Sequence, residues 1–74
     1  MTRLPRARAS DVINALHKVG FEVARIKGSH HVLVHPDGRT TVIPVHSGEV
    51  VGPGLLRQIL REAKITPEKL QDLL

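Results

Sequence analysis

Apolar residues between positions 11 and 19 recur at the spacing of an α-helix. One side of such a helix carries Val12, Ile13, Leu16 and Val19. Ser10 suits the start of the helix because its hydroxyl can cap free backbone N–H groups. Gly20 suits the end because it tolerates a positive φ, and Phe21 can then fold back onto the last turn. The pattern therefore predicts a helix over residues 11–19.

From residue 21 the apolar pattern changes to the period of two that is typical of β-strands. It predicts strands over residues 21–27, 30–35 and 40–45. The breaks between them are Gly28-Ser29 and the turn sequence PDGR at 36–39. Connections this short force antiparallel pairing, so we expect one antiparallel sheet.

The second turn determines which face of the sheet each histidine occupies. A two-residue loop on Asp37-Gly38 would place His30, Val32 and Val34 on the more apolar face, toward the helices. Neighbouring strand residues face opposite ways, so His31 would then lie on the solvent face.

Helical spacing returns near the C-terminus and predicts a helix over residues 54–63. Thr66 followed by proline and an acid predicts a further short helix over residues 67–73. The element order predicts an α+β two-layer sandwich whose topology resembles the double-stranded-RNA-binding domain. We expect one domain over residues 1–74, with residues 1–9 as a basic N-terminal arm.

Composition favours a polyanionic partner. The 74-residue chain has a formal net charge of +4, and cations that meet phosphates release counterions. An acidic protein partner would complement this positive charge equally well. Phe21 is the single aromatic residue, which argues against binding single strands by base stacking. Cysteine is absent, and neither a signal peptide nor a transmembrane run is evident, so we expect a cytoplasmic protein without membrane association.

Three histidines fall within the stretch KGSHHVLVHP. A metal site needs several imidazoles or acids that converge, and no such spacing is evident here, so we expect neither metal nor cofactor. The ordinary interpretation is that these histidines are exposed strand residues with no catalytic or metal-binding role. One feature favours catalysis: Gly28-Ser29 precedes His30 and His31. Glycine lets a phosphate approach, and serine can hold its oxygens. A neutral imidazole beside them can take a proton from a ribose 2′-hydroxyl.

The chain resembles the HicA family of toxin–antitoxin systems. The resemblance is carried, in order, by TRLPR, KVGF, GSHH, HPDGR, IPVH and GPGLLRQILR. It implies a double-stranded-RNA-binding-like fold and a metal-independent endoribonuclease that cleaves mRNA. It also implies a HicB antitoxin partner that covers the active surface, commonly in a hetero-oligomer. The family's Gly-Ser-x-His motif assigns the catalytic base to His31. The adjacent His30 is the alternative, and Ser29 is the phosphate-holding group that the residues themselves suggest.

Basic residues complete the predicted site. Lys27 and Gly28 flank the motif, and Arg57, Arg61 and Lys64 line one side of the second helix. They predict RNA binding, although a solvated helix face explains the last three equally well. Two non-enzymatic alternatives remain open: an RNA-binding module that grips duplex RNA by shape, and a small protein-interaction domain with a basic surface.

Overall fold

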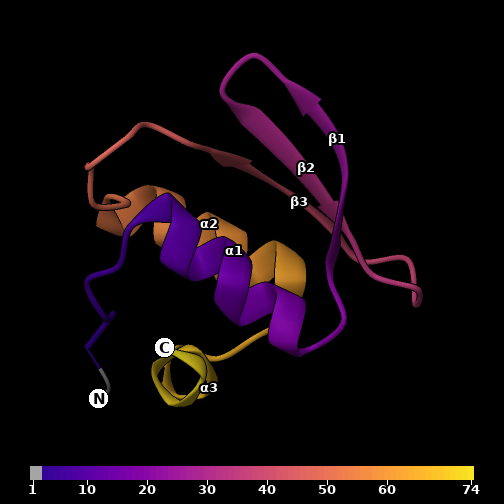
Figure 1. Ribbon diagram of the computed structural model, residues 1–74. Coiled ribbons are helices and arrows are strands. Elements are labelled where there is room, and N and C mark those ends of the chain that lie inside the picture. The colour runs from indigo at the N-terminus through magenta and orange to yellow at the C-terminus, as the bar shows by residue number, and fades with distance from the viewer. Residues whose placement is uncertain (1–2) are drawn as a thin grey trace.

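The computed structural model describes residues 3–74, which form three helices and one three-stranded antiparallel sheet in the predicted α+β order (Figure 1). The sheet order is β1-β2-β3. The bounds are α1 Ala9–Lys18, β1 Glu22–Lys27, β2 His30–Val34, β3 Thr40–Pro44, α2 Pro53–Ala63 and α3 Pro67–Leu73. The helices lie on one face of the sheet, and the turn between β1 and β2 projects beyond them.

Helix α1 begins two residues earlier than predicted, and Ser10 is not its cap. Arg8 is the N-cap residue, and its backbone N–H donates to Asp11 Oδ2 at 3.1 Å. The C-terminal end follows the prediction: Gly20 has φ +102°, and the Phe21 N–H donates to the Leu16 carbonyl at 3.1 Å. Phe21 is thereby turned fully into the core.

The N-terminal segment is docked on the body of the protein. Ala7 and Ala9 are buried, and the Val51 N–H donates to the Ala7 carbonyl at 2.8 Å. The arginines of this segment, Arg3, Arg6 and Arg8, remain exposed. Residues 4–9 therefore differ from the free arm expected of a terminus, whereas Met1 and Thr2 lie outside the described residues.

The turn between β2 and β3 shifts the register by one residue from the expected one. Gly38 has φ +98°, its N–H donates to the His35 carbonyl at 2.9 Å, and the His35 N–H donates to the Arg39 carbonyl at 2.8 Å. These bonds make a three-residue loop, Pro36 to Gly38, in place of the two-residue loop. A shift of one residue moves every side chain of β2 to the other face.

The observed pairing is His31 with Ile43 and Leu33 with Thr41. Leu33, Ile43 and Thr41 are all buried, so their face is the one the helices cover. The prediction that His31 lies on the helix-free face is therefore wrong. His30, Val32 and Val34 occupy the helix-free face.

Strand β1 carries a bulge that the alternation did not predict. Val23 pairs with Leu33 and Arg25 pairs with Val32, which leaves Ala24 as the extra residue. After the bulge the facing of the side chains is reversed, so Ile26 pairs with His31 on the helix-bearing face. All residues of β1 are exposed.

One core joins the three helices to the sheet. Its largest buried side chains are Phe21, Leu16, Leu33, Ile43, Leu56, Ile59, Leu70 and Val12. The buried Thr41 hydroxyl donates to Glu62 Oε1 at 2.8 Å, which satisfies the one buried polar side chain among the described residues.

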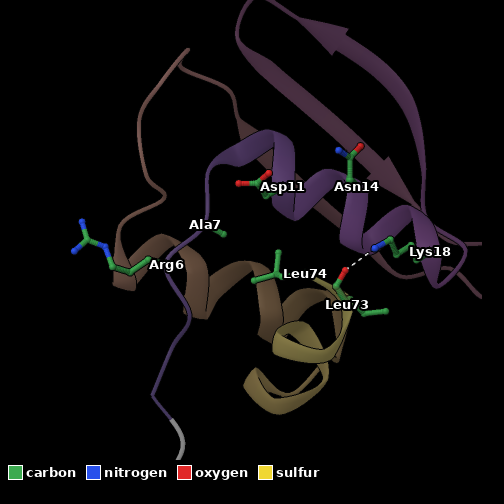
Figure 2. A pocket seen from close by; sticks show the side chains of 7 residues that line it. All are labelled: Arg6, Ala7, Asp11, Asn14, Lys18, Leu73 and Leu74. Atoms are coloured by element: carbon green, nitrogen blue, oxygen red, sulfur yellow. Dashed lines mark hydrogen bonds between the residues drawn. The ribbon is translucent and has the colours of Figure 1, made fainter.

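The short helix α3 closes the side of the core opposite the sheet. Thr66 caps it as predicted, since its hydroxyl accepts the Lys69 N–H at 3.1 Å. Lys18 Nζ donates to the Leu73 carbonyl at 2.7 Å, a bond that links α1 to α3 (Figure 2). Within residues 3–74, none of the helices has the length and apolar character needed to cross a bilayer.

Candidate active site at the β1–β2 hairpin

The Gly28-Ser29 turn connects Lys27 and His30, which pair across the hairpin. Gly28 has φ +60° while Ser29 does not have a positive φ, a combination that fits a type II′ turn. The Val45 N–H donates to the Ser29 carbonyl at 2.7 Å. This bond ties the end of β3 to the turn and fixes the backbone next to His31.

His31 lies on the helix-bearing face near the end of the hairpin and is only partly buried. The helices do not cover this end, since Ile26, directly opposite His31, is 58% exposed. The ring nitrogen Nδ1 lies 3.4 Å from the Ser29 carbonyl oxygen. A carbonyl can only accept a hydrogen bond, so a neutral ring that makes this contact carries its proton on Nδ1 and has a free lone pair on Nε2.

His30 occupies the other face of the same hairpin. It is exposed, and its neighbours on that face are Lys27, its cross-strand partner, and Arg25. The two adjacent histidines thus open onto opposite sides of the sheet. Lys27 and Gly28 are exposed, and no atom lies within 4 Å of where a Gly28 side chain would begin.

His35 is a packing residue at the other end of the sheet. Its ring stands edge-on to Phe21 with 5.1 Å between centroids. Nδ1 lies 3.1 Å from the Asp37 backbone nitrogen and 3.0 Å from Asp37 Oδ1, and Nε2 lies 3.0 Å from the Val19 carbonyl oxygen. Both ring nitrogens are therefore occupied by contacts that hold the turn against α1.

Asp37 and Arg39 complete this structural cluster. Arg39 Nε donates to Asp37 Oδ2 at 2.8 Å, Nη1 donates to the Ala63 carbonyl at 2.6 Å, and the guanidinium lies over the Phe21 ring at 5.1 Å. The Arg39 backbone N–H, which donates to Asp37 at 3.0 Å, lowers the pKa of this carboxyl, and the guanidinium adds to the effect. The HPDGR segment thus joins the sheet to both long helices.

The other histidines do not approach the hairpin site through any described contact. His17 Nδ1 lies 3.1 Å from the Phe21 carbonyl, and His46 is exposed in the loop after β3. Across residues 3–74, no three His, Asp or Glu side chains form a group that could hold a metal ion.

The three predicted RNA-binding residues of α2 lie apart from the hairpin. Arg57, Arg61 and Lys64 line a groove with Leu4, Leu60, Ile65, Thr66 and Pro67. The C-terminal end of α2 is held at the β2–β3 turn by the bond from Arg39 to Ala63, whereas His31 lies toward the opposite end of the sheet. The structure therefore brings Gly28 and Ser29 together with His31, whereas Lys27 shares the other face with His30 and the cations of α2 lie apart.

Sequence reasoning missed two features around this site. The role of Arg39 had a signal, since an arginine directly after a tight turn with aspartate can reach back to it. The facing of Ile26 had no signal in the sequence, because strict alternation without the bulge places Ile26 on the face opposite Val23.

A protein-family model matches most of the chain. The model of the family described as HicA toxin of bacterial toxin-antitoxin matches residues 9–65. That match spans α1 through the C-terminal end of α2 and includes the whole hairpin. No curated protein matches the sequence.

Proposed function

This chain belongs to the HicA family of toxins of bacterial toxin–antitoxin systems, and we propose that it is an endoribonuclease that cleaves mRNA with His31 as its base. The single observation that carries this proposal is the placement of the His31 ring. Nδ1 faces a carbonyl oxygen at 3.4 Å, and the ring is only partly buried. A neutral imidazole with a free Nε2 lone pair is the form that a general base requires.

In the proposed reaction, Nε2 of His31 accepts the proton of a ribose 2′-hydroxyl. The 2′-oxygen then forms a bond to the adjacent phosphorus, and the bond from phosphorus to the 5′-oxygen breaks. The leaving 5′-oxygen takes up a proton from the imidazolium or from water. The products are a 2′,3′-cyclic phosphate and a 5′-hydroxyl, and no metal or cofactor enters any step.

The turn residues supply the phosphate contacts in this proposal. Gly28 has open space around it, so a sugar-phosphate backbone can approach closely. The Ser29 hydroxyl and the backbone N–H groups of the turn hold the phosphate oxygens, and the flexible Lys27 side chain reaches a neighbouring phosphate. His30 opens onto the other face and is the alternative base.

We propose a second, electrostatic role for the cations of α2. Arg57, Arg61 and Lys64 are exposed, and no ion pair is recorded for them within residues 3–74. They would attract RNA phosphates some distance from the cleaved one, and the attraction would be sensitive to salt.

Membership of the family also implies pairing with an antitoxin. We propose a HicB-like protein that covers the hairpin in a cytoplasmic hetero-oligomer.

The proposal is tested with two matched oligonucleotides in the presence of a metal chelator. One is all RNA, and the other has 2′-deoxyribose at the position that the protein cleaves in the first. We expect cleavage of the first to a 2′,3′-cyclic phosphate and no cleavage of the second at the substituted position. Cleavage at a 2′-deoxy position, or no cleavage of either strand, would contradict the proposal.

A further inference from the structure

The bulge at Ala24 gives the hairpin a feature that the proposed chemistry does not yet use. Without it, Val23 and Ile26 would face opposite sides of the sheet, because their spacing in the chain is odd. With it, Val23 pairs with Leu33 and Ile26 pairs with His31, so both side chains lie on the face of the proposed base. Bulges that re-aim a side chain are common beside active sites.

Ile26 and Val23 together form an exposed surface that we call the apolar shelf. Their exposed fractions are 58% and 41%, and Ile26 is the most exposed of the large hydrophobic residues in the described chain. Residues directly opposite each other on antiparallel strands have Cβ atoms roughly 5 Å apart. The shelf is therefore within contact distance of anything that touches the exposed edge of the His31 ring.

The imidazole of His31 lies between two cross-strand neighbours that differ in exposure. On the β3 side, His31 pairs with Ile43, which is completely buried. On the β1 side it pairs with the exposed Ile26. Of the two cross-strand neighbours of His31, only Ile26 is exposed, so the shelf is the neighbour that a nucleotide bound at this ring can contact.

We infer that Ile26, supported by Val23, packs against the nucleobase of the nucleotide whose 2′-hydroxyl faces His31. This inference rests on the proposed ribonuclease function. Attack by the 2′-oxygen needs the nucleotide held in a fixed orientation, and every nucleobase has an apolar face that can pack on such a surface. Phe21, the single aromatic residue of the chain, is fully buried and cannot supply that contact.

The inference has a consequence for specificity. An aliphatic side chain has neither donor nor acceptor, so it cannot read the hydrogen-bonding edge of a base. The shelf should therefore hold all four bases with similar strength. Ile26 acts as a positioning residue whose loss raises KM, whatever the base.

The test uses four chimeric oligonucleotides, each with one ribonucleotide among deoxyribonucleotides and each with a different base on that ribose. We expect Ile26→Ala to raise KM about tenfold on all four, in the range of base-packing contacts. The larger apolar face of Ile26→Phe should restore KM to the native value or below it. The matched control is Val42→Ala, since Val42 is 40% exposed on the other face of the sheet.

A second readout uses fully deoxy strands, which the proposed reaction cannot cleave. Their Kd, followed by fluorescence anisotropy, should rise in Ile26→Ala in parallel with KM. Native KM in Ile26→Ala, or the same change in Val42→Ala, would overturn the inference while leaving the ribonuclease intact. Loss of neutralisation by the antitoxin with KM unchanged would assign the shelf to that protein and overturn the inference equally. Failure of the native protein to cleave all-RNA would instead contradict the proposed function and remove the inference with it.

Discussion

At the scale of single residues, similar side chains have different roles in different surroundings. His35 has both ring nitrogens in contacts with its own chain, at 3.1 Å and 3.0 Å. His31 has one nitrogen near a carbonyl and the other free to act on a ligand. The sequence motif does not distinguish these two histidines, because the difference lies in the contacts that each ring makes in the folded protein.

Asp37 provides a prediction about pH. Its pKa is lowered in the folded protein, chiefly by the Arg39 backbone N–H. The stabilisation from the ionised carboxylate is therefore present above its ordinary value of 3.8 and is lost as the pH falls through the folded pKa. We expect Asp37→Asn to lower the urea midpoint at about pH 7, and the difference from the native protein to shrink at about pH 2. A difference that stays constant with pH would contradict this account of Asp37.

Lys64 provides a prediction about backbone strain. It ends α2 with φ +57° and is the one non-glycine residue with positive φ among those described. Because this conformation disfavours a Cβ, we expect Lys64→Gly to stabilise the protein by about 0.5–1 kcal/mol in urea unfolding. Lys64→Ala keeps the Cβ and removes the charge, so it serves as the control. A stability of Lys64→Gly equal to or below that of Lys64→Ala would show that the left-handed conformation is not strained.

At the scale of elements, the apolar periods, with the start signal at Thr66 for the last helix, located every helix and strand to within about two residues, because each period follows from the geometry of its element. They did not determine the register. Both faces of β2 carry apolar residues, so the pattern alone could not show that Leu33, rather than Val32, is buried. The loop length at Gly38 and the bulge at Ala24 decided the facing, and neither is encoded in a hydrophobic period. The choice of His31 as candidate base does not depend on that facing, because its signal is the motif.

Two glycines in the connections between elements provide a comparative prediction. Gly20 and Gly38 have φ +102° and +98°, so alanine is strained at both positions. A Cβ at Gly20 would also lie 2.8 Å from His35 Nε2, whereas nothing lies within 4 Å at Gly38. We expect Gly38→Ala to cost about 1–2 kcal/mol and Gly20→Ala to cost at least about 1 kcal/mol more. Equal losses in urea unfolding would show that His35 moves freely and does not hold the turn against α1.

At the scale of the whole molecule, the proposed chemistry lies outside the core. The hairpin turn projects beyond the helices (Figure 1), and all residues of β1, together with His30, are exposed. Substitutions at the hairpin should therefore change activity with little change in stability. The net charge of +4 is distributed between this hairpin and other surfaces that include the groove of α2.

The groove provides a prediction about salt. If Arg57 and Arg61 contact RNA phosphates, Arg57→Ala/Arg61→Ala should raise the Kd for a single-stranded RNA. It should also reduce the slope of log affinity against log salt by about 1.4, which is the value for two phosphate contacts. The control is Arg6→Ala/Lys69→Ala, which removes the same charge outside the residues that line the groove. An unchanged slope in the groove variant would assign these cations to another role.

The most direct test of the account is the single-turnover rate constant for RNA cleavage, measured with a metal chelator for the native protein, His31→Ala and His30→Ala. Because His31 is the proposed base, its loss should lower the rate constant by about 10²- to 10⁴-fold, with the unfolding midpoint unchanged. His30→Ala should stay within about tenfold of the native protein, since that ring opens onto the other face. A rate constant for His31→Ala within about threefold of the native value would contradict the central claim.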